Sequence, residues 1–392
     1  MKTILLVSEL GGGLGHAAPL LAIADELRSE LDSVDARIIF VSGDSAGYRL
    51  VFEDVPYPMI NAPFLEPSIE FSSHSASYSE ILATFGYSRS QTLKAALRSW
   101  DDLFETTCAD LLIADHSPTA CLAARGRIPV VQIGNGFTVP PADLKRFPSL
   151  KRGFAPPTVE TPILNTVNKL LEERRQPKLQ ALPEFLDTEV RAIFTLPHID
   201  PYAGIRKEPV LGTYHTGLEP LSMPAEPSLF FYTAPEVDVM QRVVTAANKN
   251  GFRQEAYLGP VPTSESRLLE KLGVIVHYKP PSVYETLANN SVLVSHGGSG
   301  LTAAAMIAGR PLVILPRFVE SEITAQRIAN LGLGIAVENN SDNELESAIL
   351  SVTKDPQYYK SAQHMALQLQ QSGLPDNPVG DVAKKVAQLI LD

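Results

Sequence analysis

The stretch Glu9–Leu20, ELGGGLGHAAPL, follows the apolar run Ile4–Val7. An apolar run that ends in a glycine-rich turn predicts a buried first strand leading into a helix. In dinucleotide-binding folds this turn holds a pyrophosphate, and Gly11 and Gly13 occupy the first two glycine positions of that pattern. The third glycine position holds His16. The turn is therefore either an altered phosphate loop or a turn that presents a histidine.

The same alternation of short apolar runs and helical patterns continues along the chain. In the first half we expect strands at residues 4–7, 37–41, 111–114, 130–133 and 192–196, and helices at 19–31, 81–107, 119–125 and 165–179. In the second half we expect strands at 229–232, 274–278, 292–295 and 312–315, and helices at 237–249, 301–308 and 323–331. Strands separated by helices predict an α/β fold whose parallel sheets are covered on both faces.

Length and charge restrict the classes of protein that fit. The chain has 392 residues, which suits two domains of about 150–200 residues each. Its 44% hydrophobic and 20% charged residues are typical of a soluble globular protein. The net charge of -11 argues against nucleic acid as a partner. The two cysteines, Cys108 and Cys121, define neither a disulfide framework nor a metal site.

No apolar run is long enough for a signal peptide or a membrane-spanning helix, so we expect a cytoplasmic protein without a transmembrane segment. Prolines are dense between Pro140 and Pro227, which indicates loops and a linker. The expected domains are residues 1–205 and 206–375, with residues 376–392 as a helix that packs back on the first domain. Two doubly wound domains joined in this way would bind ligands at the carboxyl ends of their sheets. No oligomeric state is predicted.

Residues 278–321 read YKPPSVYETLANNSVLVSHGGSGLTAAAMIAGRPLVILPRFVES. Without a gap, this run resembles the donor-binding box of the sugar-nucleotide-dependent glycosyltransferases of the plant secondary-product and macrolide type, a UDP-glycosyltransferase-like family. That box opens with Trp-Ala-Pro-Gln, carries a His-Cys-Gly-Trp-Asn-Ser-Thr-Leu-Glu segment and closes on an acidic residue and Gln. Tyr278 takes the opening position, His296 the histidine, and Glu320 and Ser321 the closing pair. The resemblance implies the GT-B fold, with two Rossmann-like domains facing across a cleft.

The resemblance also implies a catalytic pair in the first half. The family places a histidine at the end of the first strand–turn, where His16 stands, and an aspartate after a later strand, where Asp115 follows LLIA. A neutral imidazole can remove the proton of an acceptor hydroxyl, and a buried carboxylate behind it fixes the tautomer and stabilises the imidazolium. This reading favours a turn that presents the base. The alternative is a helix-start histidine that hydrogen-bonds the loop.

For the donor, the resemblance implies a diphosphate held by a histidine and by N–H groups at a helix start, an arrangement that helix N-termini favour. Tyr278 would stack on the nucleobase, as the Trp of the family does. The residues implied in donor binding are Gly13, Thr233, Tyr278, His296, Gly297, Gly298, Ser299, Gly300, Thr302, Glu320 and Ser321. Without the rest of the box, the glycines alone would indicate an ordinary strand–helix turn.

Three features depart from the family pattern. Ala304 replaces the glutamate that grips both ribose hydroxyls, which forfeits hydrogen bonds of about 1.5–3 kcal/mol. Ser321 replaces the closing Gln, and the Trp and Asn inside the box are Ser299 and Gly300. Loss of the ribose contact favours a deoxyribose donor such as a dTDP-sugar, and the altered closing pair favours a deoxysugar. A UDP-hexose is the other candidate donor.

The acceptor is expected in the first domain, within residues 64–87. The aromatic residues Phe64, Phe71, Tyr78 and Phe85 would form a wall for a small, partly apolar acceptor, unless they face the core instead. Residues 144–154, LKRFPSLKRGF, combine basic and apolar side chains. That combination suits peripheral contact with an anionic lipid or a phosphorylated acceptor, or an ordinary solvated loop.

The expected function is that of an inverting, metal-independent glycosyltransferase with a nucleoside diphosphate sugar as co-substrate and no cofactor. No Asp-x-Asp motif stands beside an expected strand end to hold a metal, so no metal ligands are predicted. One alternative is a transferase acting on a lipid-linked acceptor at the membrane surface. Others are a sugar-nucleotide 2-epimerase, disfavoured by the box and the pair, and a non-catalytic partner that activates another transferase. The presence of His16 and Asp115 disfavours this last alternative, whereas Ala304 and Ser321 are compatible with it.

Overall fold

The computed structural model describes residues 1–11, 13–31, 35–52, 55–63, 65, 67, 76–151, 158–232, 237–259, 262–337 and 342–391. The chain forms two compact units. The first contains Met1–Phe194, Asp200–Tyr214 and Asn377–Asp392, and the second contains Thr195–Ile199 and His215–Asp376. Residues 200–214 therefore belong to the first unit, and the chain returns to that unit at its C-terminal end.

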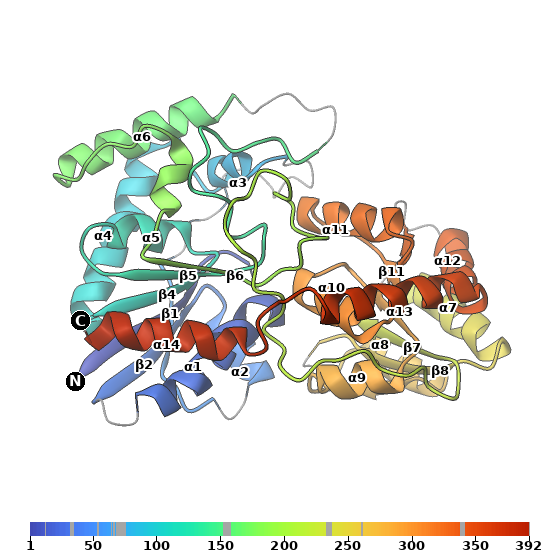
Figure 1. Ribbon diagram of the computed structural model, residues 1–392. Coiled ribbons are helices and arrows are strands. Elements are labelled where there is room, and N and C mark those ends of the chain that lie inside the picture. Colours follow the sequence, from blue (N-terminus) through green and yellow to red (C-terminus); the bar gives the residue numbers. More distant parts are fainter. Residues whose placement is uncertain are drawn as a thin grey trace. The chain divides into compact units, whose positions relative to one another are not determined.

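Six parallel strands form the sheet of the first unit, in the order β3-β2-β1-β4-β5-β6 (Figure 1). The strands are β1 Lys2–Ser8, β2 Ala36–Ser42, β3 Met59–Asn61, β4 Leu111–Asp115, β5 Val130–Gly134 and β6 Val190–Ile193. The helices are α1 Leu14–Glu30, α2 Ser45–Val51, α3 Tyr78–Thr84, α4 Ser90–Thr107, α5 Pro118–Ala124, α6 Glu160–Glu173, the 3-10 helix η1 Leu182–Leu186, and α14 Pro378–Leu391. The strand order reverses between β1 and β4, and α/β sheets bind ligands at such a switch point.

The second unit repeats the same winding, because its parallel sheet has the order β12-β11-β10-β7-β8-β9. Its strands are β7 Ser228–Tyr232, β8 Arg253–Tyr257, β9 Ile275–His277, β10 Val292–Ser295, β11 Leu312–Ile314 and β12 Gly334–Ala336. Its helices are α7 Val237–Lys249, α8 Ser264–Lys271, α9 Val283–Asn289, α10 Ser299–Ala308, α11 Val319–Asn330, α12 Asp342–Lys354 and α13 Pro356–Gln370. Here the switch point lies between β7 and β10.

The α/β fold expected from the alternation of strands and helices is confirmed. The pattern does not predict β3, β8 and β12, nor helices α2, α8, α9, α12 and α13. Two of the missed strands, β3 and β12, are edge strands of 3 residues each. The third, β8, has the polar sequence RQEAY, and its buried Gln254 and Glu255 are held by side-chain hydrogen bonds.

The single helix expected at residues 81–107 is wrong, because the structure has two helices there. Phe85 is the C-cap of α3, and the next helix, α4, begins only at Ser90. Gly86, with φ +80°, turns the chain between the two helices in a conformation that a residue with a Cβ rarely adopts. Glycine at this position outweighs the helical periodicity around it.

The C-terminal helix α14 completes the core of the first unit. It lies along α1 (red and blue in Figure 1), and the two helices meet through buried apolar residues. Leu20, Ile23 and Leu27 of α1 belong to the same core cluster as Val382 and Val386 of α14. Each of these five side chains is at most 2% exposed. Removing α14 would therefore open the core beside β1.

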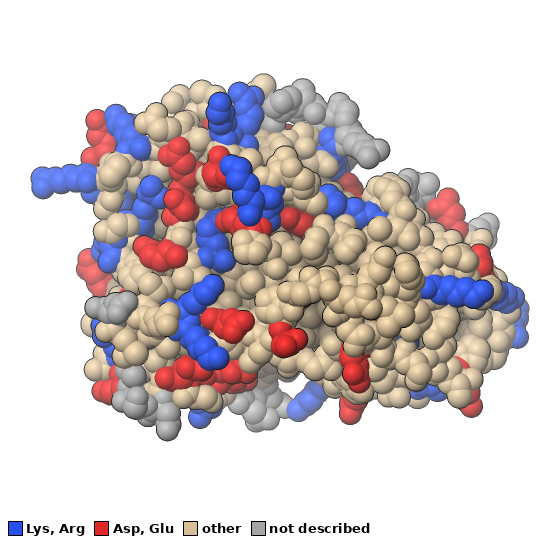
Figure 2. Space-filling view, in the orientation of Figure 1, with Lys and Arg blue, Asp and Glu red and all other residues tan. Residues whose placement is uncertain are grey.

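The two units differ in charge on the face that Figure 2 shows. Figure 2 shows Lys and Arg side chains intermixed with Asp and Glu on the visible face of the first unit, whereas the visible face of the second unit is mostly uncharged. Among the described residues, no helix combines the length and the apolar character needed to cross a membrane.

Candidate functional site

A histidine and an aspartate meet at the carboxyl end of the first sheet. Asp115 is the last residue of β4 and pairs in register with Ser8, the last residue of β1. His16 lies in the first turn of α1, after the glycine turn that follows β1. His16 Nδ1 lies 3.3 Å from Asp115 Oδ2, and the two side chains are 18% and 2% exposed. The structure thus brings the two expected catalytic residues into hydrogen-bonding contact.

Glycine in the turn makes room for the imidazole. Gly11 has φ +87°, and a Cβ at this position would lie 2.3 Å from His16 Nε2. A side chain there would collide with the ring nitrogen that faces away from Asp115. Gly13 is the N-cap residue of α1 and has φ +84°, and a Cβ on it would meet no atom within 4 Å. Its expected contact with the donor stays a prediction.

Burial and pairing act in opposite directions on Asp115. Burial raises the pKa of the Asp115 carboxyl, the His16 imidazole and its hydrogen bond lower it, and the net pKa lies above the ordinary value. The second carboxylate oxygen, Oδ1, is buried without a hydrogen-bond partner in the described part of the chain. His16 is therefore the contact that compensates the cost of burying this carboxyl.

A second imidazole, that of His116, lies against the ring of His16. The two ring centroids are 5.8 Å apart with an interplanar angle of 26°, which is a stacked arrangement. His116 has φ +43°, an uncommon backbone conformation for a residue with a Cβ. Burial, and to a smaller extent His16, lowers the pKa of His116 to about 3, so this ring is neutral at physiological pH. His116 supplies a surface for the base without adding charge beside it.

Aromatic side chains pack next to the His16–His116 pair. Tyr78, at the start of α3, lies 6.0 Å from His116, 6.3 Å from Phe137 and 5.0 Å from Phe147, measured between ring centroids. Tyr78 is 0% and Phe85 is 6% exposed. Both expected acceptor residues are thus buried, Tyr78 beside the His16–His116 pair. The other two, Phe64 and Phe71, lie outside the described residues.

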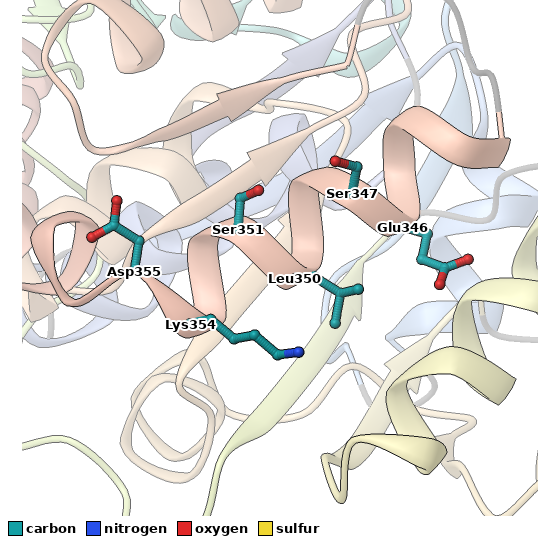
Figure 3. A pocket seen from close by; sticks show the side chains of 6 residues that line it. All are labelled: Glu346, Ser347, Leu350, Ser351, Lys354 and Asp355. Atoms are coloured by element: carbon teal, nitrogen blue, oxygen red, sulfur yellow. The ribbon is translucent and has the colours of Figure 1, made fainter.

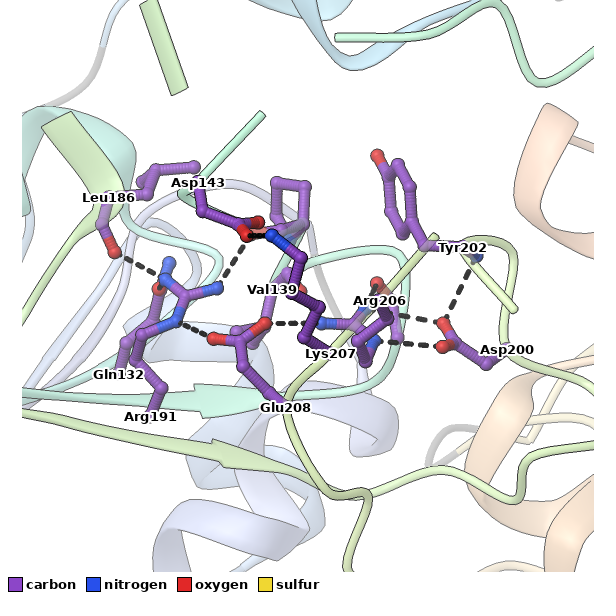
Figure 4. Close-up of polar contacts among 12 residues, drawn as sticks. Gln132, Val139, Asp143, Leu186, Arg191, Asp200, Tyr202, Arg206, Lys207 and Glu208 are labelled. Atoms are coloured by element: carbon purple, nitrogen blue, oxygen red, sulfur yellow. Dashed lines mark hydrogen bonds and ion pairs between the residues drawn. The ribbon is translucent and has the colours of Figure 1, made fainter. Parts of the chain in front are cut away.

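A buried ion pair fixes the loop that carries Phe137. Arg206 and Asp200 pair at 2.8 Å with side chains 2% and 3% exposed. Arg206 also donates to the carbonyl oxygens of Gly136, at 2.8 Å, and Val139, at 3.0 Å (Figure 4). A buried guanidinium with all of these acceptors holds its loop in one arrangement. Phe137 is therefore placed 6.5 Å from His116 by a network that starts at Asp200.

The second unit carries the other expected cluster. His296 directly follows β10, and its ring lies 5.8 Å from that of Tyr232 at the end of β7. Burial, followed by the nearby Arg317, lowers the pKa of His296. Gly297 has φ +84°, and a Cβ there would lie 2.7 Å from Ile314 Cγ2, so only glycine fits. Gly298 is the N-cap residue of α10.

The first turn of α10 contains Ser299, Gly300 and Thr302. Thr302 is 0% exposed, and its hydroxyl has no hydrogen-bond partner among the described residues. No side chain caps this helix start, so backbone N–H groups point out of it. An uncapped helix start with an unpartnered buried hydroxyl is suited to an anion. Ala304, one turn further along, is 0% exposed.

The closing pair lies at the start of α11. The Ser321 hydroxyl accepts hydrogen bonds from Arg317 N, at 2.9 Å, and Phe318 N, at 3.0 Å, and donates to Phe318 O at 2.8 Å. These contacts use the full hydrogen-bonding capacity of a hydroxyl, and Ser321 is 4% exposed. Ser321 thus shapes the start of the helix, and Glu320 is the half-buried member of the pair.

Tyr278 directly follows β9, and its hydroxyl donates to Glu270 Oε1 of α8 at 2.7 Å. This contact fixes the ring that is expected to stack on a nucleobase. Thr233, the remaining expected donor residue, lies outside the described residues. In the basic and apolar stretch 144–154, Phe147 is 0% exposed and packs on Tyr78, so it faces the core rather than a lipid.

One surface depression of about 720 Å³ lies over α12, lined by Glu346, Ser347, Leu350, Ser351, Lys354 and Asp355 (Figure 3). All six residues belong to this helix or directly follow it, and none is among the expected site residues. Within the described ranges, His, Cys, Asp and Glu nowhere form a group of three that could hold a metal ion.

Sequence reasoning missed His116, Glu9 and Ser117, which all contact the segments that carry the pair. A weak signal was present, because Glu9 stands inside the first glycine-rich stretch and His116 directly follows Asp115. Their roles depend on side-chain packing between two distant segments, which a pattern of residue types does not encode.

Residues 275–389 match the family model described as "Erythromycin biosynthesis protein CIII-like, C-terminal domain". The NDP-glycosyltransferase YjiC of Bacillus subtilis (strain 168) is 31% identical over 100 residues, which is 25% of this chain and 26% of that protein. A sterol 3-beta-glucosyltransferase of Komagataella phaffii is 35% identical over 77 residues, 20% of this chain and 6% of that protein. The matched part thus spans about a quarter or less of these relatives.

Solved structures are similar over nearly the whole chain. The calicheamicin glycosyltransferase CalG4 has a TM-score of 0.68 and 20% identity, covering 99% of this chain and 98% of that one. The Streptomyces sp. SF2575 glycosyltransferase SsfS6, complexed with thymidine diphosphate, has a TM-score of 0.62 and 18% identity, covering 99% and 100%. The spinosyn rhamnosyltransferase SpnG, complexed with spinosyn aglycone, has a TM-score of 0.65 and 15% identity, covering 98% and 100%. These similarities confirm the GT-B fold, and the family model confirms the resemblance seen in the C-terminal box.

Proposed function

We propose that this chain, whose residues 275–389 match the family model described as "Erythromycin biosynthesis protein CIII-like, C-terminal domain", is a glycosyltransferase. It transfers a sugar from a nucleoside diphosphate to a hydroxyl group of a small, partly apolar acceptor, with inversion at the anomeric carbon and without a metal. The observation that carries the proposal is the contact of His16 Nδ1 with Asp115 Oδ2 at 3.3 Å, at the switch point of the first sheet.

In the proposed step, His16 is the general base. Its Nδ1–H donates to the Asp115 carboxylate, and Nε2 takes the proton of the acceptor hydroxyl. The acceptor oxygen forms a bond to the anomeric carbon while the bond from that carbon to the diphosphate oxygen breaks. The electron pair of the broken bond leaves with the nucleoside diphosphate. One displacement from the opposite face inverts the configuration of the anomeric carbon.

The second unit holds the donor in this proposal. The N–H groups at the start of α10 and the Thr302 hydroxyl hydrogen-bond the diphosphate, and the helix N-terminus stabilises the charge that grows on it. Because burial lowers the pKa of His296, this ring acts as a neutral N–H donor to a phosphate oxygen. Tyr278 stacks on the base, and Glu320 accepts hydrogen bonds from sugar hydroxyls.

The proposed donor is a dTDP-sugar. Ala304 stands where the family has the glutamate that binds the ribose hydroxyls, and a thymidine nucleotide has no 2-hydroxyl to satisfy. Structures of SsfS6 and SpnG with thymidine diphosphate have the same fold as this chain. The altered closing pair supports a deoxysugar, and a UDP-hexose is the donor to exclude.

The proposed acceptor is apolar and aromatic or polycyclic. The half-buried His116 ring beside the base, which packs on the buried rings of Tyr78 and Phe137, supports this choice. A lipid-linked acceptor is less well supported, because Phe147 of the basic stretch faces the core. A non-catalytic partner protein would not need a paired base, so the His16–Asp115 contact argues against it.

The test has two steps. Thermal shift with dTDP-glucose, UDP-glucose and GDP-mannose identifies the donor class, because a ligand that binds only the folded state raises Tm. The donor that stabilises most is then incubated with a panel of phenols and polycyclic alcohols, and products are identified by mass spectrometry. A product heavier than the acceptor by one sugar residue is expected. The non-catalytic alternative would instead be supported if this chain binds the donor and forms no product by itself, while a candidate partner enzyme becomes active in its presence.

A further inference from the structure

Hydrogen bonds beyond the end of the sheet join the two segments that carry the catalytic pair. Glu9 N donates to Ser117 Oγ at 2.8 Å, and Leu10 N donates to His116 O at 3.0 Å. The Ser117 hydroxyl in turn lies 2.8 Å from Asp115 O and is positioned to donate to it. The pairing of β1 with β4 therefore continues past the last strand residues, up to the glycine turn before His16.

The side chain of Glu9 adds a second connection. Its Oε2 accepts hydrogen bonds from Thr119 N at 2.8 Å and Ala120 N at 3.4 Å, in the first turn of α5. The residue is 1% exposed, and Oε1 has no hydrogen-bond partner within the described residues. Thr119 is itself fixed by a contact of 2.7 Å between its hydroxyl and Tyr87 OH. One carboxyl thus ties the exit of β1 to the helix that follows Asp115.

A carboxyl is costly to bury, and an apolar residue would fill this place without that cost. What an apolar residue would not do is bind the N–H groups of α5 and so fix the exit of β1. His16 lies seven positions after Glu9 in the sequence. The turn between Glu9 and the start of α1 contains three glycines. Because glycine allows many backbone conformations, the position of His16 depends on where that turn is anchored.

We propose that Glu9 is a positioning residue of the catalytic pair: with Ser117, it anchors the turn that carries His16 at a fixed distance from Asp115. The catalytic part of this inference rests on the proposed function, whereas its structural part rests on the contacts given above. The anchor acts through backbone and cap contacts, and Glu9 itself does not touch the acceptor or the donor.

The structural part is tested in the free protein, without any substrate. In protein labelled with ¹⁵N-histidine, NMR detects the Nδ1–H signal of His16. This signal is identified by its absence from the spectrum of His16→Ala. We expect Glu9→Ala to shift this signal toward that of Asp115→Ala, because the contact with the carboxylate is lost. We expect Glu9→Gln to retain the wild-type signal, because the amide oxygen can accept the same hydrogen bonds from α5.

The catalytic part is tested with the donor and acceptor found for the wild-type protein. A misplacement of about 1 Å costs on the order of 10² in rate, so we expect kcat to fall by roughly tenfold to a hundredfold in Glu9→Ala, with KM for the donor unchanged. Glu9→Gln should restore kcat to within about threefold of wild type. The matched control is Asp355→Ala, which removes a carboxyl cap from α13 in the second unit, where Asp355 Oδ1 accepts from Gln357 N at 2.9 Å.

The outcomes are distinct. A wild-type His16 signal together with wild-type kcat in Glu9→Ala would overturn the proposal. Equal loss of kcat in Glu9→Ala and in Asp355→Ala would also overturn it, because the effect would then be one of general stability. If Glu9→Ala does not fold, Ser117→Ala carries the same two readouts, since it removes the hydroxyl that Glu9 N binds. If wild type transfers no sugar, the proposed function fails, while the NMR comparison still decides the anchor.

Discussion

Glu9 and Asp115 are both buried carboxyls at the ends of adjacent strands, yet their surroundings assign them different tasks. Asp115 contacts an imidazole, and Glu9 contacts two backbone N–H groups. Burial raises the pKa of both groups, for Glu9 to about 7 against the ordinary 4.5. Because both pKa values are raised, we expect Asp115 to make the activity of the protein depend on pH and Glu9 to make its stability depend on pH.

For Asp115, the expected result concerns activity. Asp115→Asn keeps a hydrogen-bond acceptor but loses the charge that stabilises the imidazolium, so kcat should fall by roughly 10–10², less than on removal of the base. The pKa of Asp115 lies above its ordinary value. As the pH is lowered, kcat of the wild type should therefore begin to fall at a higher pH than it would if Asp115 had the pKa of an exposed aspartate. The variant should lack this part of the profile. Full activity of Asp115→Asn between about pH 6 and 9 would reduce Asp115 to a structural role.

For Glu9, the expected result concerns stability. Between pH 4.5 and about 7 the folded protein keeps the proton of this carboxyl while the unfolded chain loses it, so the contribution of Glu9 to stability falls as pH rises through that range. Glu9→Gln does not titrate. Relative to wild type it should gain roughly 3 kcal/mol of unfolding free energy between about pH 4 and pH 8, measured by urea denaturation. A difference that stays constant with pH would show that Glu9 titrates normally.

Among the elements, α10 has the strongest link between sequence and site. The run VSHGGSG predicts a strand, a glycine turn and a helix start, and the structure has β10, Gly297 with φ +84° and α10 in this order. Sequence patterns fail where the element is short or polar, as in β12 and β8, or where one glycine interrupts a helix, as at Gly86. They also miss the Glu9–α5 contact, because it joins residues 110 positions apart.

The start of α10 makes a prediction about the donor. Thr302→Val replaces a buried, unpartnered hydroxyl by a methyl group of similar shape. The free protein should be as stable as wild type or slightly more stable, whereas Kd for dTDP should rise at least about tenfold, since a hydrogen bond to a charged group contributes roughly 1.5–3 kcal/mol.

The matched control is Thr353→Val in α12, whose hydroxyl donates to Ile349 O at 2.6 Å. This change should lower Tm slightly and leave Kd for dTDP unaltered. If Thr302→Val also lowers Tm and leaves Kd unaltered, Thr302 serves the helix and not the diphosphate. Kd for dTDP is measured by calorimetric titration, and Tm is measured by a thermal scan of the same protein.

For the whole molecule, the sequence predicts two wound α/β units and a GT-B fold because the box, the glycine turn and the alternation of strands all agree. The burial of individual side chains changes the roles expected for them. Tyr78 and Phe147 are core residues, and Ser321 serves its own helix. Residue identity alone does not distinguish an aromatic side chain that lines a site from one that fills a core, because both require the same apolar surface.

The choice of nucleotide is a property of the complete donor site. We expect dTDP-glucose to bind at least as tightly as UDP-glucose, and dUDP-glucose separates the effect of the ribose hydroxyl from that of the thymine methyl group. Ala304→Glu should shift the ratio toward UDP by roughly 1–2 kcal/mol, up to about thirtyfold. Because Ala304 is 0% exposed, the thermal stability of this variant is checked first. A wild-type preference for UDP above tenfold would show that another group binds the ribose.

Whether His16 removes the proton of the acceptor is decided by the kcat of His16→Ala with two acceptors of different acidity. With an alkyl alcohol such as benzyl alcohol, the loss should be roughly 10²–10⁴. With p-nitrophenol, which gives up its proton readily, the loss should be much smaller, and Kd for dTDP should equal that of wild type. An equal loss of kcat with both acceptors, or turnover of the alcohol at the wild-type rate, would show that His16 is not the base.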